Sequence, residues 1–423
     1  MNRKDFISTV LGAALAPAMN DAMAMGLPNQ KVDRLTDEPF WTKIRNEFVL
    51  DRNFIDLRAS GASSIPRVSM NKFLSDFQYV QSFPSDRSAP TTEASMERLR
   101  GKLAGQINCL AKEIAVVRNT TEALNNAIMG FPFQKGDEVV ASVHEYDSMM
   151  GSFYQRKIRD GIVIKNLEIP YKISNTKEIL KLWEQSITPK TKAFLISQIV
   201  WISGQIYPVK EICELARKHD IVTIVDAAHS FSHLKIDVKD LGCDYLGTSL
   251  HKWCAAPIGT GFLYIKRDLI AKTFPLFAHY VHKPDEDAIE KFDNLGTITP
   301  IFDAAIASID FWDNLGFELK TKRMHYLKRY WTTRLKQNPK IEIVTDTDEK
   351  FSCGLAFFKI NGKSSTAVKN VLWKEHRIKV AAIENYKNHY VDYAGVNAIG
   401  VATPVYITTK ELDRFIQAVE RIA

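Results

Sequence analysis

The segment "IVTIVDAAHSFSHLKIDVKDLGCDYLGTSLHKWCAAPIGTGFLYIKRD", residues 221–268, decides the fold class of this chain. It opens with an apolar run that ends in Asp226, and two further apolar runs follow, "DYLGTSLHKW" and "GTGFLYIKR". Upstream runs of the same kind are "EIAVVRN", "DEVVASVHEY", "IVIKNLEI" and "TKAFLISQIV". Helical patterns separate most of these runs, which is typical of a parallel sheet covered on both faces. We therefore expect an α/β fold with a mainly parallel sheet.

The pattern changes after about residue 300. Helices are expected at "IFDAAIASIDFWDNLG" and "FELKTKRMHYLKRYWTTRLKQ", and strands at "IEIVTD", "SCGLAFFKI" and "RIKVAAI". The closing helix, "TTKELDRFIQAVERIA", has Thr408 or Thr409 as its cap and Glu411 near the capping-box position. These elements predict a smaller α+β domain at the C-terminus.

The remaining elements complete the expected organisation. A helix leading into an extended arm is expected at 39–57, and a long helix at 92–112. The predicted units are a signal peptide at 1–24, an N-terminal arm joining the small domain at 25–60, a large domain at 61–305 and the small domain at 306–423.

Composition excludes several classes of protein. A length of 423 residues favours two domains. The formal net charge is +7, but the basic residues are scattered along the chain and form no dense block, so nucleic-acid binding is not indicated. Five cysteines without a C-x-x-C pair predict neither a zinc site nor a disulfide framework, and no metal site is expected. No apolar run is long enough for a confident membrane span.

The N-terminus, "MNRKDFISTVLGAALAPAMNDAMAM", has the order of a secretory signal: basic residues, an apolar stretch, and small residues up to Ala24. Its Arg-Lys-Asp-Phe start resembles a twin-arginine signal with lysine at the second position. We expect export to the bacterial periplasm. The alternatives are a disordered tail or a short amphipathic helix, and a cytoplasmic protein.

The stretch "VVRNTTEAL" is the first to carry chemistry. It places Asn119, Thr120 and Thr121 where a strand turns into a helix. Free backbone N–H groups and two hydroxyls at a helix N-terminus suit a phosphate. An ordinary helix cap is the competing interpretation.

Two further stretches come from the segment quoted first. Asp226 ends a buried strand and needs a partner that offsets its desolvation, which the protonated nitrogen of a heterocycle, an arginine or a buried water would supply. Taken alone, it could equally be a structural turn residue. Lys252 lies on a short connection with Ser249 and His251, and a desolvated lysine is an amine nucleophile able to form a Schiff base. A phosphate cradle, a ring-nitrogen acid and such a lysine together indicate pyridoxal 5′-phosphate.

With these residues in this order, the chain resembles the class V aminotransferase family of fold-type I pyridoxal-phosphate enzymes, from about Phe40 to the C-terminus. The resemblance is most specific in residues 225–268, and the histidine after Asp-Ala-Ala is typical of the isopenicillin N epimerase-like branch, where cysteine desulfurases mostly carry glutamine. It implies the fold-type I transferase architecture of a large domain with a seven-stranded sheet plus a smaller α+β domain.

The resemblance also implies roles for individual residues. Lys252 matches the Schiff-base lysine, Asp226 the acid on the pyridine nitrogen, and His229 the residue near the phenolic oxygen. The expected phosphate ligands are Thr120, Thr121, Ser249 and His251.

Two more positions follow from the resemblance. Tyr146 in "SVHEYDSMM" aligns with a residue that stacks on the cofactor, although a core aromatic is the alternative. Thr297 in "NLGTITP" matches a threonine that reaches the phosphate of a neighbouring subunit, so a homodimer with shared active sites is expected.

Departures from the family pattern bear on the substrate. Relatives acting on amino acids hold the α-carboxylate with an arginine near the C-terminus, and Gly400 stands there in "AIGVATPVYITTKEL". We hypothesise that Arg58 in "FIDLRASGASSIP" replaces that anchor; a structural salt bridge is the alternative. Trp201 and Ser203 depart from the family near the cofactor and are further candidates for contacting the substrate, with core packing as the alternative for Trp201.

The expected function is a pyridoxal-phosphate enzyme that forms a carbanion at Cα of an amino acid or amine, most like the epimerase or aminotransferase members. A C–S or C–C lyase is the alternative within enzymes, and a non-catalytic binding protein of the same fold is the other. Persulfide chemistry is not expected, because no cysteine lies between Ala381 and Thr403, Cys353 falls in an expected strand and Cys254 has the setting of a packing residue.

Overall fold

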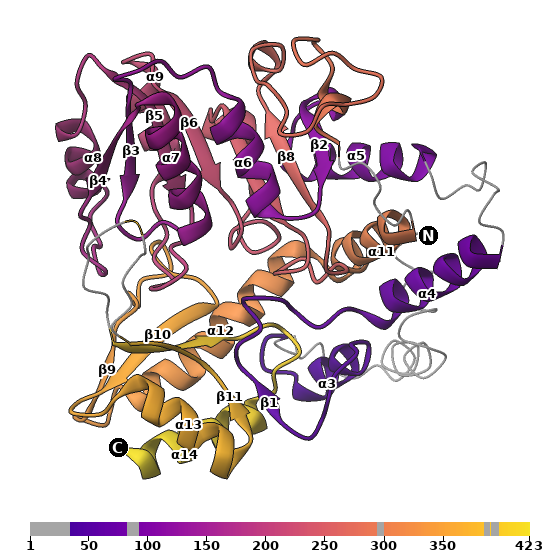
Figure 1. Cartoon of the computed structure of the whole chain (residues 1–423). Coiled ribbons are helices and arrows are strands. Elements are labelled where there is room, and N and C mark those ends of the chain that lie inside the picture. Colours follow the sequence, from indigo (N-terminus) through magenta and orange to yellow (C-terminus); the bar gives the residue numbers. More distant parts are fainter. Residues whose placement is uncertain (1–33, 83–92, 294–299, 385–389, 391–396) are drawn as a thin grey trace, which may run out of the picture.

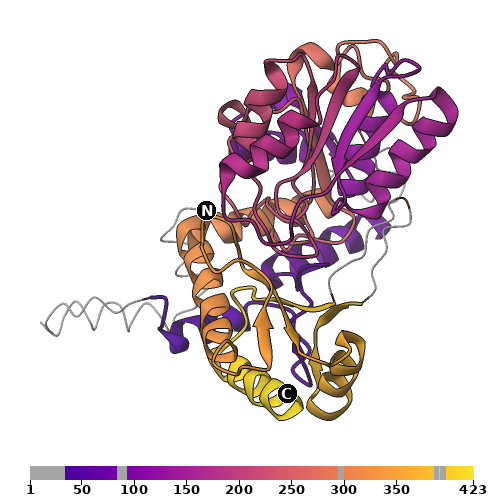
Figure 2. The ribbon, with the colours of Figure 1, turned by 90° about the vertical axis from the view of Figure 1, so that its left-hand side faces the viewer.

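The computed structural model describes residues 34–82, 93–293, 300–384, 390 and 397–423. A large unit is built around a seven-stranded sheet, and a smaller unit around a four-stranded sheet lies beside it (Figure 1). Seen from the side, the large sheet runs between layers of helices (Figure 2). The expected α/β fold with a seven-stranded sheet is confirmed.

The large sheet is mostly parallel. Only β8 runs antiparallel to its neighbours, β2 and β7, whereas the other neighbouring pairs are parallel. Its strands, in spatial order, are β2 (Ile114–Val117), β8 (Gly261–Ile265), β7 (Tyr245–Ser249), β6 (Val222–Asp226), β5 (Thr191–Ser197), β3 (Glu138–Ser142) and β4 (Val163–Leu167).

Both faces of this sheet are buried, which explains the continuous apolar runs. On β8, Phe262 and Tyr264 enter one hydrophobic core while Leu263 and Ile265 enter the other. The helices around the large sheet are α5 (Glu93–Ile107), α6 (Thr120–Gly130), α7 (Asp147–Asp160), α8 (Thr176–Gln185), α9 (Val209–Arg217) and α10 (Val238–Leu241), with 3₁₀ turns η1 (Ala111–Glu113), η2 (Arg267–Leu269) and η3 (Ile289–Phe292). Helices α6 and α7 contribute to one core and α5, α8 and α9 to the other.

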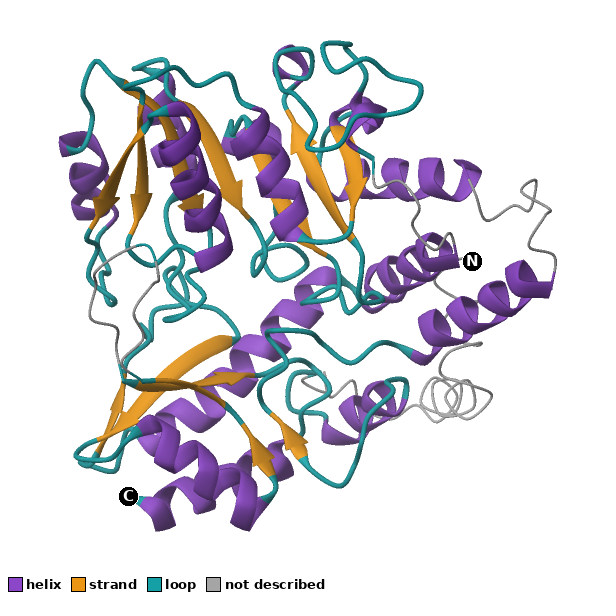
Figure 3. Cartoon of the chain, in the orientation of Figure 1, coloured by secondary structure: helices purple, strands orange, loops and turns teal. Residues whose placement is uncertain are grey.

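The smaller unit contains an antiparallel sheet in the order β12 (Ala381–Ile383), β13 (Ala398–Ala402), β10 (Leu355–Ile360) and β9 (Ile341–Ile343). Helices α12 (Phe317–Leu335), α13 (Ser365–His376) and α14 (Thr409–Ile422) accompany it (Figure 3). Thr408 and Glu411 form the capping box of α14, as predicted.

The N-terminal part of the described chain packs on this smaller unit. Strand β1 (Ile55–Asp56) pairs in parallel with β11 (Ile378–Lys379), and Arg45 of α3 (Glu38–Asn46) donates two hydrogen bonds to the carboxylate of Glu411. Helix α4 (Arg67–Ser82) lies against α11 (Pro300–Leu315). Arg58 lies in the segment that connects β1 on the smaller unit to α4.

Two local expectations were wrong. The helix predicted at 92–112 ends at Ile107, because Asn108 takes a left-handed conformation with φ 57°. The run "RIKVAAI" forms two short strands, β11 and β12, which belong to different sheets.

Among the described residues, no helix is long and apolar enough to cross a membrane. The predicted signal at 1–24 and Thr297 lie outside the described residues.

Candidate active site

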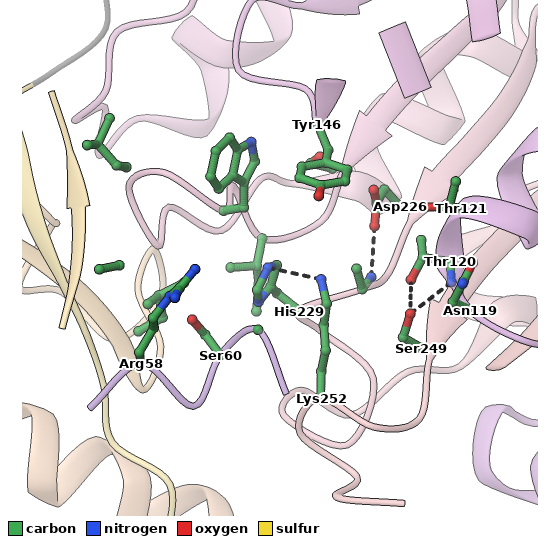
Figure 4. A pocket seen from close by; sticks show the side chains of 18 of the residues that line it. Arg58, Ser60, Asn119, Thr120, Thr121, Tyr146, Asp226, His229, Ser249 and Lys252 are labelled. Carbon is green, nitrogen blue, oxygen red and sulfur yellow. Dashed lines mark hydrogen bonds between the residues drawn. The ribbon is translucent and has the colours of Figure 1, made fainter. Parts of the chain in front are cut away.

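A cavity of ≈ 440 Å³ lies where the carboxyl ends of the large-sheet strands face the smaller unit (Figure 4). Open α/β sheets bind their ligands at this edge. Most of the site residues predicted from the sequence line the cavity: Arg58, Thr120, Thr121, Tyr146, Trp201, Asp226, His229, Ser249, His251 and Lys252.

Lys252 follows β7 and points its amine into the cavity (Figure 4). Removal from water lowers the pKa of this amine, and the nearby carboxylate of Asp226 opposes the shift. The Nζ atom lies 3.3 Å from Nε2 of His229. A lysine whose pKa is lowered supplies more of the neutral amine, which is the nucleophilic and basic form.

Asp226 is the last residue of β6 and is buried. Its Oδ1 accepts a hydrogen bond from the N–H of Ala228 at 2.8 Å. Burial raises its pKa, while Lys252 and the Ala228 N–H lower it. The Ala228 bond fits a turn residue, but the carboxylate also faces the cavity, where a protonated ring nitrogen would offset its desolvation.

His229 sits between Lys252 and the next residue in the chain, Trp253. Its Nδ1 accepts from the indole Nε1–H of Trp253 at 3.4 Å. Burial, followed by the charges of Lys252 and His233, holds the pKa of His229 well below its usual range. The ring is therefore a neutral hydrogen-bonding group at neutral pH.

Helix α6 starts at the end of the cavity that lies opposite Arg58 (Figure 4). Asn119 caps it by accepting from the N–H of Glu122, and the Ser249 hydroxyl accepts from the Thr120 N–H at 2.8 Å. Gly261 lets β8 approach this turn, because a Cβ there would lie 2.9 Å from the Asn119 nitrogen. The first residues of the helix line the cavity, and a helix N-terminus suits an anion.

The residues present fit pyridoxal phosphate. His251 lines the cavity, and its buried Nδ1 has no hydrogen-bond partner among the described residues, so it is a polar atom whose need for a partner a bound phosphate would satisfy. Lys252 and Asp226 supply the amine and the acid that the cofactor needs.

Two aromatic rings form part of the cavity wall. Tyr146 precedes α7 and is 45% exposed, so it is not a core aromatic. Its ring meets that of Trp201 edge to face, with the centroids 5.5 Å apart. Trp201 is half-buried and lines the cavity.

Ser203 does not line the cavity, which corrects its assignment as a substrate contact. It is buried, its hydroxyl accepts from the N–H of Gln205, and its carbonyl accepts from the Thr345 hydroxyl. The next residue, Gly204, has φ 70°, and a Cβ there would overlap the carbonyl oxygen of Leu355, so the smaller unit packs directly against this turn.

The smaller unit contributes a wall of the cavity that the sequence did not predict. It consists of Leu355, Phe357, Lys369, Ala381, Ala382 and Ile383. The apolar members lie on or beside β10 and β12, and Lys369 lies on α13. Nothing in the sequence indicated which edge of the small sheet faces the large unit.

The chain matches one protein family over most of its length. The family model for aminotransferase class V matches residues 60–411. Isopenicillin N epimerase from Streptomyces clavuligerus is 24% identical over 399 residues, covering 90% of this chain and 98% of the relative. A probable cysteine desulfurase from Halalkalibacterium halodurans is 30% identical over 325 residues, covering 73% and 77%.

Solved structures share the fold. A cysteine desulfurase from Thermococcus onnurineus has a TM-score of 0.77 at 21% identity, covering 90% of this chain and 97% of that one. The cystine C–S lyase C-DES, in complex with cysteine persulfide, has a TM-score of 0.77 at 20% identity, covering 86% and 97%. This chain belongs to the class V aminotransferase family and is a pyridoxal-phosphate-dependent enzyme.

Proposed function

We propose that this enzyme removes the Cα proton of an amino acid, with Lys252 as the base. The observation that carries the proposal is the cluster of the half-buried Lys252 with the buried His229 and Asp226 in one cavity. When bound, the cofactor supplies a sink for the electron pair left at Cα. Asp226 holds a proton at the ring nitrogen, His229 orients the Lys252 amine, and the start of α6 with His251 binds the phosphate.

Arg58 holds the substrate carboxylate in this proposal. Its guanidinium makes no hydrogen bond or ion pair within the described parts of the chain, although it lines the cavity, and this favours the anchor over a structural salt bridge. At Gly400 a Cβ would lie 2.6 Å from the ring of Phe357, so Phe357 occupies the space of any side chain there. A carboxylate contact from position 400 is therefore blocked, whereas Arg58 is available.

Exchange of the Cα proton tests this function. The purified enzyme with pyridoxal phosphate is incubated in D₂O with panels of L-amino acids, and loss of the Cα proton signal is followed by NMR. We expect exchange on at least one class of amino acid with wild type and none with K252A. Absence of exchange across the panel, despite formation of the cofactor absorbance band, would reject Cα deprotonation.

The fate of the carbanion separates the remaining alternatives. Appearance of the D-isomer indicates epimerisation, and transfer of the amino group to an oxo acid indicates transamination. Release of pyruvate and ammonia together, or release of alanine, indicates a lyase. Similarity to isopenicillin N epimerase over nearly the whole chain favours epimerisation. None of the five cysteines lines the cavity, which disfavours a persulfide-forming cysteine.

We also propose a homodimer with shared active sites. A short surface segment exposes several large apolar side chains, namely Phe274, Leu276, Phe277, Tyr280 and Val281. Exposed apolar groups gathered in one segment are typical of association surfaces. Light scattering of the holoenzyme tests the dimer, and a monomer with full activity would reject the sharing of sites.

The N-terminal sequence leads us to propose export of the folded protein. Because the cofactor is bound in a folded site, a twin-arginine-like route is compatible with loading before transport. N-terminal sequencing of the mature protein from cell fractions tests this: cleavage near Ala24 in the periplasmic fraction supports export, and an intact Met1 in the cytosol rejects it.

A further inference from the structure

Trp253, the residue after the proposed catalytic lysine, is buried and touches the active-site histidine. Its indole Nε1–H lies 3.4 Å from Nδ1 of His229. An indole nitrogen can donate a hydrogen bond but cannot accept one. The Nδ1 atom must therefore accept, and it carries no proton in this arrangement.

The proton of the neutral His229 ring then belongs on Nε2. That atom lies 3.3 Å from Nζ of Lys252. A protonated Nε2 offers a donor to the lone pair of the uncharged amine, whereas the other tautomer would offer a lone pair and favour the ammonium form. The tautomer of His229 thus biases the protonation state of Lys252.

Trp253 is fixed at both its side chain and its backbone. Its ring lies against His233, with the centroids 4.0 Å apart, and its carbonyl accepts from Nζ of the buried Lys320 at 2.6 Å. His233 in turn accepts from the N–H of Gly354 at 2.9 Å, and its Nδ1 lies 3.2 Å from the His229 carbonyl oxygen. These contacts keep the indole N–H aimed at His229.

We propose that Trp253 is a positioning residue that sets the Nε2–H tautomer of His229, so that the histidine presents a donor to the Lys252 amine. The consequence for catalysis rests on the proposed function of Lys252, but the tautomer itself does not. The competing interpretation is that Trp253 only fills space beside His233.

The first test measures the tautomer. The full chain is labelled with ¹⁵N-histidine and its side-chain nitrogens are observed by NMR, with and without pyridoxal phosphate; loss of a signal in H229Q assigns His229. We expect wild type to have Nε2 protonated and Nδ1 unprotonated. A protonated Nδ1 in wild type overturns the proposal, whatever the variants do.

Two variants separate tautomer control from packing. W253F keeps an aromatic ring beside His233 but loses the indole N–H, and we expect a mixture of His229 tautomers. W312F is the matched control, because Trp312 donates its own indole N–H to the neighbouring carbonyl of Cys254 at 2.6 Å. The control should leave the His229 signals unchanged. A single Nε2–H tautomer in folded W253F overturns the proposal.

The second test follows Lys252 through the rate at which added pyridoxal phosphate is taken up, measured by absorbance as a function of pH. Loss of a donor to the neutral amine raises the pKa of Lys252, so the rate profile of W253F should move to higher pH by about half a unit to one unit. The W312F profile should stay in place. A profile in W253F that keeps its midpoint and only loses amplitude overturns the link to Lys252. No uptake in wild type would instead reject the proposed function.

Discussion

The two walls of the active-site cavity differ in how their side chains are held. The wall from the large unit, the polar wall, carries most of the polar side chains beside the rings of Tyr146 and Trp201, and hydrogen bonds fix several of these polar groups to one another, as in the pairs Thr120–Ser249 and His229–Lys252. The wall from the smaller unit is mostly apolar, with Leu355, Phe357 and the strand β12. The fixed wall suits the cofactor and the proton transfer, and the apolar wall suits the selection of a substrate.

The cationic side chains that line the cavity also differ in how they are held. Lys252 is hydrogen-bonded to His229, and the charge of Asp226 raises the pKa of its amine against the lowering effect of burial. Arg58 and Lys369 also line the cavity. Their charged groups form no ion pair with any of the described residues. A cation without a protein partner is available for a ligand, so the substrate contacts should be found on the side of Arg58.

The largest effect is expected from K252A. Removing the amine removes both the covalent attachment of the cofactor and the base, so turnover should fall by at least about 10³-fold. Turnover and the absorbance of the lysine-bound cofactor are the measurements. K266A, at an exposed lysine after β8, is the control and should behave as wild type. K252A with turnover near the wild-type rate would show that the polar wall does not hold the catalytic base.

A smaller but still large loss is expected from D226N. The amide keeps the shape and the hydrogen bond from Ala228 but loses the charge that holds a proton on the ring nitrogen. Turnover should fall by about 10²–10³-fold with the cofactor still bound, as for other losses of electrostatic stabilisation. Rates and cofactor absorbance are measured together. Unchanged turnover would assign Asp226 to the turn alone.

The sequence predicted the polar wall far better than the apolar one. Asp226, His229 and Lys252 lie within one continuous segment whose strands end at a common edge, so their convergence follows from a parallel sheet. Phe357 could not be predicted in the same way. Its place depends on the packing of β10 against the large unit and on the pairing of Phe357 with Gly400, which are long-range contacts without a local signal.

The same limit explains the errors. Ser203 follows a large-sheet strand in sequence, yet the smaller unit covers it, since its carbonyl is bonded to Thr345. The splitting of "RIKVAAI" arises because β1, more than 300 residues earlier in the chain, takes the first half as its partner.

Among changes outside the polar wall, R58A should act mainly on substrate binding. Loss of a guanidinium–carboxylate contact is expected to raise KM by about 10-fold to 100-fold while the cofactor absorbance stays unchanged. R52A is the matched control, because Arg52 is exposed and bonds to Asn46 away from the cavity. Equal KM values for R58A and wild type would leave the substrate anchor to another residue.

The Phe357–Gly400 pair should show coupling in stability. G400R alone forces a side chain into the Phe357 ring and should lower the free energy of unfolding by about 1–3 kcal/mol. F357A/G400R relieves the overlap, so its loss should be smaller than the sum of the two single losses. Denaturant unfolding of the four proteins measures this. Additive losses would show that the two residues do not compete for space.

The smallest effect is expected behind the polar wall, at Glu145. Its carboxylate is buried and accepts from the hydroxyls of Ser142 and Ser197, and burial, with the charge of Asp226, raises its pKa to about 7. Between pH 4.5 and 7 the folded protein then binds more protons at this site than the unfolded chain, so the free energy of unfolding falls as the pH rises through that window.

E145Q removes this titration while keeping the size of the side chain. The decrease in Tm between pH 5 and pH 8 should therefore be smaller in E145Q than in wild type, by a few degrees at most. F357A, which changes the apolar wall, should keep the wild-type slope, because Phe357 has no titrating group. Identical slopes in E145Q and wild type would place the pKa of Glu145 outside the window. A reduced slope in E145Q alone would locate the pH sensitivity in the wall that holds the cofactor, apart from the wall that selects the substrate.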